Sequence, residues 1–485
     1  MTSRTRRTVI NSLVVGVINF LNYLPMIALL ILLMRRLGVD DFGKYSYVYS
    51  LGWIFQILGT LGTDAIIVRD LAQDKENCRK NAGAFILLRA LVGTFSGLIY
   101  ATLALREDPL FQTAMLFYAV GVALAGMFAA FQSVLVSRER FGFRGAVLLI
   151  SSLSQLGLAA FLLWREVEWT WLVLAVHVIG MGIGTLLAGV LAYSQTGPWE
   201  WRVRKDHVQK LLGNGLIYGY FYILCNSASR TDEVILKSVR DASELGLLSA
   251  AKRLYDPMVV FLSAMLTEAM FPVISEIHAS APGLLRDAYR QIMRFSLLVI
   301  APLSLFLIFF AAGVMNLVGS QEYAPAGGAL QILAAFMIPA NWHTVQVRFL
   351  FATRSERRVI LPVTFRLALS ILLGIWWASW WGYRGAAAAF GVAISVEMIW
   401  YAWEVRRLIG PWHPLQLFWR PALANGLFAL VLFFASGLNL FLALLLAAGV
   451  YPVLLRLTGS LSWQEAIGLL KRSSREKSVG KKLGS

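Results

Sequence analysis

The sequence has few of the residues that hold metal ions or disulfide bonds. It contains two cysteines and five histidines, and Cys78 and Cys225 stand far apart with neither a CxxC nor a Cys/His spacing. The G-x-x-x-x-G-K-[ST] motif, whose backbone holds nucleotide phosphates, is missing as well. The sequence therefore predicts no disulfide, no metal site, no cofactor and no ATP-driven machinery within this chain.

Charge is scarce too, and hydrophobic residues take its place. Only 15% of the 485 residues are charged, whereas 58% are hydrophobic and the mean hydropathy is +0.66. A soluble domain is far more polar, so a two-domain soluble enzyme is excluded. Apolar runs long enough to cross a bilayer core, which takes about 20 helical residues, recur along almost the whole chain. We therefore expect an all-α, multi-pass membrane protein.

The apolar runs predict about 14 transmembrane helices. We place them at residues 9–34, 46–70, 82–105, 110–136, 145–164, 169–193, 213–236, 244–274, 292–318, 326–351, 360–381, 385–405, 418–437 and 439–457. Lys and Arg are concentrated in the connections that lie inside if the N-terminus is cytoplasmic, which indicates an N-in, C-in orientation. Topology thereby explains most of the formal net charge of +17, and nucleic acid is not an expected partner.

The connections are short, and the longest of them divides the chain. We expect a six-helix N-lobe at 1–193, a cytoplasmic linker at 194–212, a six-helix C-lobe at 213–409, two further helices at 410–457, and a basic amphipathic or disordered cytoplasmic tail at 458–485. Membrane-bound glycosyltransferases and ligases generally need a large outer loop that carries catalytic carboxylates. No such loop is present, which disfavours an enzyme, and we predict no catalytic residue.

Two short echoes indicate that the lobes repeat one another. The segments 41–46 and 244–249 both read acid-apolar-Gly-x-x-Ser and enter the second and eighth helices, respectively. Ser137-Arg138-Glu139-Arg140 after the fourth helix pairs with Arg354-Ser355-Glu356-Arg357 after the tenth. Repeated halves are how many transporters build a site near the middle of the membrane.

Several of these motifs resemble a known family. They are the run 36–46, the Val68-Arg69-Asp70 ending of the second helix, Asp232, Glu244-Leu245-Gly246, the run 250–254, and Gly382-Tyr383-Arg384-Gly385-Ala386-Ala387. Together they resemble the Wzx-type polysaccharide-biosynthesis flippases, members of the superfamily that also contains MurJ-type lipid II flippases and MATE drug exporters. Fourteen helices exceed the twelve of many members, which leaves the role of the last two open.

The resemblance implies two lobes around a central cavity that opens alternately to each side of the bacterial cytoplasmic (inner) membrane. The cargo would be a polyprenyl-diphosphate-linked oligosaccharide, such as an O-antigen, exopolysaccharide or capsule repeat unit. Membrane lipids, a polysaccharide polymerase and other assembly proteins would be partners. The alternatives are a lipid II flippase or a MATE-like drug/cation antiporter, and, less expected, an envelope glycosyltransferase or ligase.

A diphosphate inside the membrane needs cations, and two helices supply them beside other polar groups. On the seventh helix, at about 100° per residue, one continuous stripe holds Tyr218, Tyr222, Asn226, Ser229, Arg230 and Glu233. A second stripe on the eighth helix holds Ser249, Lys252, Asp256, Ser263 and Thr267, with Arg253 on its flank. We expect the cavity to be lined by Tyr222, Asn226, Arg230, Glu233, Lys252, Arg253 and Asp256. The alternative is that the cations only form ion pairs with Asp232, Glu233 and Asp256. The slight excess of cations favours an anionic head group over a drug cation.

Further polar residues lie in other helices. Asn19 and Asn22 in the first helix, near Pro25, suit sugar hydroxyls, although hydrogen bonding between helices is an equal alternative. His177 and Glu397 lie near the midpoints of the sixth and twelfth helices and are candidates to bind a coupling proton or cation, with a scaffold role as the alternative. We expect four arginines in the inner thirds of their helices to snorkel to the cytoplasmic interface: Arg69, Arg89, Arg348 and Arg366.

Overall fold

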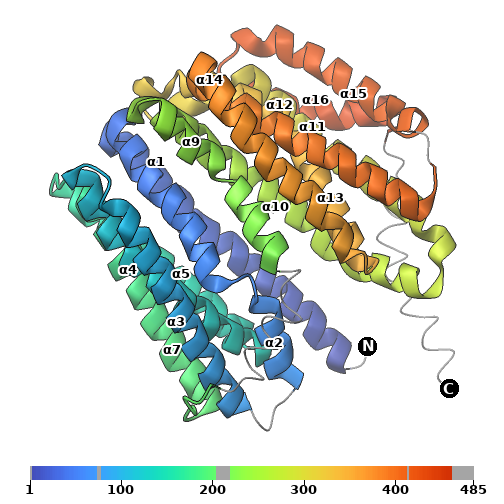
Figure 1. Cartoon of the computed structure of the whole chain (residues 1–485). Coiled ribbons are helices and arrows are strands. Elements are labelled where there is room, and N and C mark those ends of the chain that lie inside the picture. Colours follow the sequence, from blue (N-terminus) through green and yellow to red (C-terminus); the bar gives the residue numbers. More distant parts are fainter. Residues whose placement is uncertain (1–2, 74–77, 204–218, 412–413, 461–485) are drawn as a thin grey trace, which may run out of the picture. The chain divides into compact units, whose positions relative to one another are not determined.

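The computed structural model describes residues 3–73, 78–203, 219–411 and 414–460, and all regular structure among them is helical (Figure 1). The elements are α1 Ser3–Thr60, α2 Asp64–Gln73, α3 Cys78–Ala104, α4 Pro109–Ser137, α5 Phe141–Trp164, α6 Trp169–Val173, η1 Leu174–Gly180, α7 Met181–Thr196, α9 Thr231–Val239, α10 Ala242–Ser280, η2 Pro282–Leu284, α11 Leu285–Val318, η3 Gln321–Tyr323, α12 Ala326–Ala335, α13 Met337–Ala352, η4 Glu356–Val359, α14 Ile360–Ile409, α15 Pro414–Phe434, η5 Ala435–Gly437 and α16 Leu440–Leu457. Residues 219–228 are helical as well.

These helices confirm the predicted fold class. Every predicted span is mostly helical where the chain is described; residues 213–218 of the seventh span and the tail from 461 on lie outside the described residues. Eight helices in the described part are long and apolar enough to cross a membrane. The protein is an all-α, multi-pass membrane protein. Helices suit this environment, because each one satisfies its backbone hydrogen bonds within its own segment. The count of fourteen crossings and the N-in, C-in orientation stay predictions.

Two glycines kink helices that the hydropathy pattern separates. Gly38 lies inside α1 with a φ of 69°, and Gly382 lies inside α14 with a φ of 57°. This left-handed region favours glycine, which has no Cβ to collide with the backbone. Each kink therefore turns the chain between two predicted spans without a loop.

Three other predicted spans are interrupted, which corrects the expectation of continuous helices. Residues 61–63 separate α1 from α2 within the second span, and a turn at Ser229 and Arg230 separates helix 219–228 from α9 within the seventh. Phe336 separates α12 from α13 within the tenth. Leu61 and Gly62 adopt φ values of 49° and 59°. A break leaves backbone groups without helical partners, and such groups persist inside a membrane only where other protein groups or water satisfy them.

The second sequence echo is structural, but its register differs from the predicted one. Arg138 after α4 and Thr353 after α13 have nearly the same backbone angles, φ/ψ of −94°/8° and −95°/16°. The next residues, Glu139 and Arg354, both have positive φ, 58° and 54°. Arg354 thus corresponds to Glu139 rather than to Ser137, so the predicted pairing was wrong by two positions.

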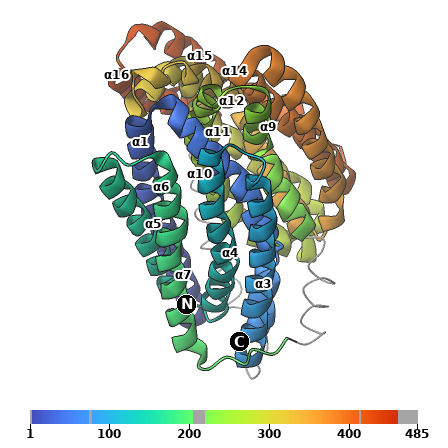
Figure 2. The same ribbon diagram turned by 60° about the vertical axis from the view of Figure 1, so that its left-hand side comes forward.

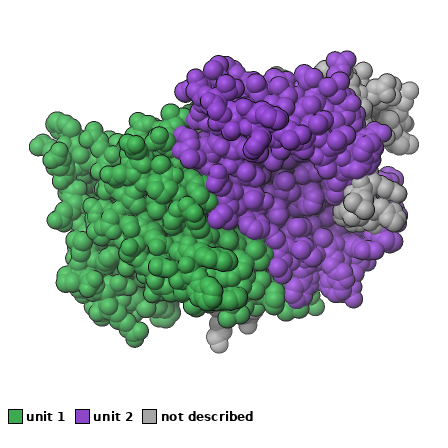
Figure 3. All heavy atoms as spheres, turned by 90° about the horizontal axis from the view of Figure 1, so that it is seen from above, with its two compact units in different colours: residues 1–253, 315–329, 356–393 green, residues 254–314, 330–355, 394–485 purple. Residues whose placement is uncertain are grey.

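The described chain separates into two compact units (Figure 3). Unit 1 comprises residues 1–253, 315–329 and 356–393, and unit 2 comprises 254–314, 330–355 and 394–485. In unit 1, α3 runs beside α4, and α1 packs on α4 and α5 (Figures 1 and 2). The predicted division into lobes at residues 1–193 and 213–409 stays a prediction.

Each unit has its own apolar core. In unit 1, helices α2, α3, α4, α5 and α7 contribute buried side chains such as Leu71, Phe85, Leu135, Val147 and Ala192. In unit 2, α11, α15 and α16 pack through the buried residues Phe306, Phe310, Phe428, Leu432, Ala443 and Tyr451. The last two predicted helices therefore share a core with α11, which fixes them to unit 2 through close side-chain packing.

Candidate functional site

Lys252 of α10 is completely buried and held by the break before α9. Its ammonium group donates to the Ser229 carbonyl oxygen at 2.6 Å and forms an ion pair with Asp232 Oδ1 at 2.6 Å. The Phe390 ring lies 4.7 Å from the Lys252 nitrogen. The turn at 229–230 exposes this carbonyl to Lys252, so the break and the buried charge stabilise one another. Lys252 therefore forms the ion pair with Asp232 that the sequence offered as the alternative to a cavity-lining role.

Glu233 lies at the centre of the predicted cationic group. It is buried, accepts a hydrogen bond from Ser50 of α1, and pairs with Arg230 Nη1 at 3.3 Å. The charges of Arg230, Lys252 and Arg253 all act on this carboxylate. The structure therefore brings the three predicted cations together, although the continuous stripe on the seventh helix was wrong.

Arg253 differs from the other two cations because it makes no ion pair with any residue that the structure describes. Its guanidinium carbon lies 4.4 Å from the ring centre of Tyr49, and its Nη2 donates weakly to Ser46 at 3.4 Å. The side chain is partly buried, and its Nε has no hydrogen-bond partner among the described residues. Stacking on an aromatic ring stabilises a cation without neutralising it. The guanidinium of Arg253 thus has no ion pair with a described residue, although its charge acts on the Glu233 carboxylate over a longer distance.

His177 lies against the aromatic residues that surround Arg253. It lies in the π-helical turn η1, its Nε2 and the Tyr45 hydroxyl are 2.9 Å apart, and its ring centre lies 4.5 Å from that of Tyr118 and 5.5 Å from that of Tyr49. The imidazole is buried. This arrangement satisfies one ring nitrogen and places His177, a candidate for the coupling proton or cation, beside the cationic group.

Tyr222 and Asn226 lie on the helical segment 219–228, before the break. The Asn226 amide donates to the Tyr222 carbonyl oxygen of its own helix at 2.8 Å. The Tyr222 side chain is half-exposed, and the charges of Asp64 and Arg89 act on its hydroxyl. The structure therefore places Tyr222 near a second charged group.

Arg89 of α3 belongs to that second group, which corrects the expectation that it snorkels. It is 1% exposed, and its Nη2 donates to Asp64 Oδ1 at 2.6 Å. Arg366 is also buried, beside the Phe390 ring, whereas Arg69 and Arg348 are exposed as predicted. Hydropathy indicates only how deep an arginine lies along its helix, and the packing of neighbouring helices decides whether its head group reaches water.

The remaining candidates of the cavity are less informative. The side chain of Asn19 lies outside the described residues, and that of Asn22 is partly buried with its amide oxygen and nitrogen unpartnered among the described residues. Asp256 lies on α10 in unit 2 and is partly buried. The cavity role of Asn19, Asn22 and Asp256 stays a prediction.

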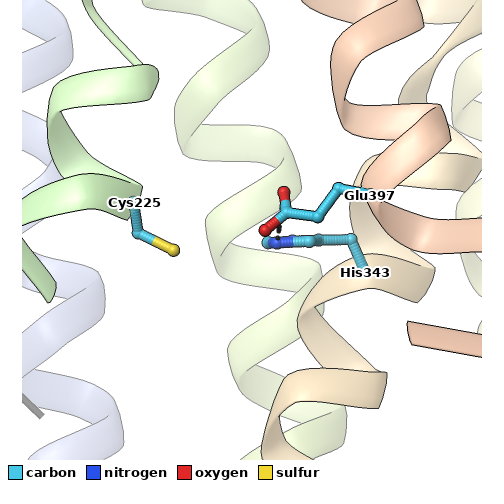
Figure 4. Close-up of side chains that lie close together, drawn as sticks. All are labelled: Cys225, His343 and Glu397. Carbon is cyan, nitrogen blue, oxygen red and sulfur yellow. Dashed lines mark ion pairs between the residues drawn. The ribbon is translucent and has the colours of Figure 1, made fainter. Parts of the chain in front are cut away.

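Glu397 of α14 forms a buried polar triad in unit 2. Its Oε2 lies 3.1 Å from His343 Nε2 of α13 (Figure 4), and the Tyr401 hydroxyl donates to its Oε1 at 2.9 Å. Sequence reasoning selected Glu397 but missed His343, although a histidine inside a predicted membrane helix carried the same signal. A buried carboxylate with a histidine beside it is able to exchange a proton, which gives the predicted coupling role a physical basis without testing it.

Comparisons with known proteins bear on the family and the fold. The model of the polysaccharide biosynthesis protein family matches residues 8–278. No curated protein matches the sequence significantly. The solved structure of lipid II flippase MurJ in an inward closed conformation is 14% identical, with a TM-score of 0.69 over 91% of this chain and 98% of that chain. An inward-facing MATE-family multidrug resistance transporter of the MOP superfamily is also 14% identical, with a TM-score of 0.67 over 80% and 94%.

A MOP superfamily transporter from Pyrococcus furiosus is a third structural relative. Its structure, described by a reversed polarity of the binding pocket, is 14% identical and gives a TM-score of 0.56 over 82% of this chain and 94% of that chain. At such identities the likeness shows a shared fold. The charge of a binding site has to be argued from the residues of this chain.

Proposed function

Because this chain belongs to the polysaccharide biosynthesis protein family, we propose that it is a flippase for a polyprenyl-diphosphate-linked oligosaccharide. It carries the lipid-linked repeat unit across the bacterial cytoplasmic membrane by alternating access and makes or breaks no covalent bond. The substrate lipid and the surrounding membrane lipids are its direct partners. A polysaccharide polymerase and other assembly proteins act on the delivered unit.

One observation carries this proposal: the guanidinium of Arg253 forms no ion pair with a described residue. The cationic group contains Arg230, Lys252 and Arg253, whereas its carboxylates are Asp232 and Glu233, so one positive charge remains in excess. Lys252 and Arg230 pair with those carboxylates, which leaves Arg253 to meet an anion. A guanidinium binds phosphate with two parallel hydrogen bonds, and a low-dielectric surrounding strengthens them.

The tyrosines around Arg253 fit the same substrate. Tyr45 and Tyr49 lie 6.0 and 4.4 Å from its guanidinium carbon, measured to their ring centres. Aromatic rings with hydroxyl groups offer both an apolar face and a hydrogen-bond donor, which suits a diphosphate joined to a sugar. A drug cation would instead meet a positive charge here and be repelled.

The test compares charge-keeping and charge-removing variants of Arg253. We expect Arg253→Lys to retain part of the export of surface polysaccharide, because a point charge still attracts phosphate, and Arg253→Ala to lose it. Membrane protein level is measured in parallel, and Arg106→Ala, at an exposed arginine, is the matched control. Normal export from a well-expressed Arg253→Ala protein would refute the proposal.

A further inference from the structure

The break between α1 and α2 forms a second charged site in unit 1, separate from the cationic group around Arg253. Leu61 and Gly62 have positive φ, and Asp64 begins α2 directly after them. The close approach of helix 219–228 stabilises this conformation, since a Cβ added to Gly62 would lie 2.9 Å from Gly219 Cα. The break is therefore a packed feature of the fold, not a frayed helix end.

Arg89 points its head group at this break and is incompletely satisfied there. One guanidinium nitrogen donates to Asp64, but its Nε and Nη1 are buried and have no hydrogen-bond partner among the described residues. The Asp64 side chain is 43% exposed, so solvent reaches the group from that side. Unsatisfied guanidinium hydrogens inside a protein are rare, which indicates that an acceptor belongs beside them.

Two further donors surround the same point. The charge of Asp64 acts on Arg144 of α5, and Arg144 Nε is buried without a hydrogen-bond partner among the described residues. The Thr63 hydroxyl, directly before α2, is also buried without a hydrogen-bond partner among the described residues. The first amides of a helix add a partial positive charge. With two arginines against one carboxylate, the group is positively charged and rich in unused donors.

We propose that Arg89, Arg144, Thr63 and the start of α2 form a second binding site for a phosphate-bearing head group. This inference rests on the proposed function: the predicted orientation puts the site in the cytoplasmic half of unit 1, where a lipid-linked diphosphate arrives. Asp64 holds Arg89 in place until the phosphate takes over its donors. The head group of an anionic phospholipid has the same chemistry and is the competing source.

The segment 219–228 links this site to the cationic group. Tyr222 lies at the Asp64 end of the segment, Asn226 follows one helical turn later, and Arg230 lies in the break itself. Eight residues from Tyr222 to Arg230 correspond to about 12 Å at the helical rise. The head group would thus move only a short distance from one site to the other, and Tyr222 and Asn226 would contact it on the way.

The experiment measures binding of inorganic pyrophosphate to the purified full chain in phosphatidylcholine nanodiscs, by its effect on thermal unfolding. We expect Arg144→Gln, which breaks no ion pair with a described residue, to weaken binding roughly tenfold. Asp64→Asn, which removes the competing carboxylate, is expected to strengthen it. Arg106→Gln, at an exposed arginine, is the control and should bind as wild type does. Unchanged binding in both Arg144→Gln and Asp64→Asn would overturn the proposal.

Further measurements distinguish an anionic phospholipid from a lipid-linked diphosphate, and the site around Arg89 from the cationic group around Arg253. If nanodiscs that contain phosphatidylglycerol abolish the pyrophosphate response, the site holds anionic phospholipid and its role in substrate transfer is refuted; an undiminished response supports the lipid-linked diphosphate. Arg253→Ala should keep this Arg144-dependent binding and lose export. Normal export by Arg253→Ala beside a lost response in Arg144→Gln would refute the proposed function alone.

Discussion

Gly43 and Gly246 form a reciprocal close contact: each glycine lies against the backbone of the helix that carries the other. A Cβ added to Gly43 would lie 1.7 Å from the Ala242 carbonyl oxygen, and one added to Gly246 would lie 2.0 Å from the Val39 carbonyl oxygen. Both pairs join a motif glycine to the residue four positions before the other glycine. The acid-apolar-Gly-x-x-Ser echo therefore marks a close, symmetric helix contact inside unit 1.

This contact predicts that Gly43→Ala and Gly246→Ala each destabilise the protein. The added methyl group cannot fit against a backbone oxygen, and overpacking of this kind costs about 1–3 kcal/mol. Because both changes widen one contact, the double variant should lose less than the sum of the single variants. Thermal unfolding in detergent measures all three. Gly157→Ala, at a glycine of α5 with open space around it, should be neutral or slightly stabilising.

The buried Lys252–Asp232 pair gives a second prediction. Lys252→Ala removes the buried cation that pairs with Asp232 and should lower the free energy of unfolding by about 3–5 kcal/mol. The double variant Lys252→Met with Asp232→Leu should recover much of that loss, since both charges of this pair are then replaced by apolar side chains.

The exposed pair between Lys44 and Asp40 is the control for that comparison. Its nitrogen–oxygen distance is also 2.6 Å, but both side chains reach solvent. Lys44→Ala should therefore change stability by only about 0–1 kcal/mol. An equal loss in Lys44→Ala and Lys252→Ala would mean that burial does not determine the strength of these pairs.

The third prediction concerns energy coupling through Glu397 and His177. If either residue carries a proton, Glu397→Gln or His177→Gln should abolish the dependence of transport on a pH gradient while the protein stays folded. Tyr401→Phe, which removes one hydrogen bond to Glu397 but keeps its carboxylate, should retain the response. If transport keeps its pH response in both Glu397→Gln and His177→Gln, these two residues belong to the scaffold.

The fourth prediction concerns topology. Reporters fused after Ser485 and inserted near Trp199 should both be cytoplasmic, and a fusion truncated after Leu438 should face outward, because the Lys/Arg bias sets the orientation. Alkaline phosphatase and green fluorescent protein fusions report the two sides. An outward position of Ser485 or Trp199 is incompatible with fourteen crossings.

Much of the fold was determined by the sequence itself. Runs of about 20 apolar residues predict membrane helices because the bilayer leaves the backbone no other partner for its hydrogen bonds. The same logic correctly predicted helix over most of the described part of each of the fourteen spans, and the echo around Gly43 and Gly246 predicted a repeated element that the structure brings into contact. These features depend on local composition and spacing, which a sequence contains completely.

The pairing of charges was decided only by the tertiary structure. Nothing around Ser229 and Arg230 signals a break, since neither glycine nor proline is present there. The periodicity of polar residues therefore predicted one continuous helix. The break lets Lys252 reach both Ser229 and Asp232, and so leaves Arg253 to stack on Tyr49, a residue far away in the sequence. Sequence spacing gives the face of a helix but not the neighbour across it, and that neighbour determines whether a buried charge is neutralised or available to a substrate.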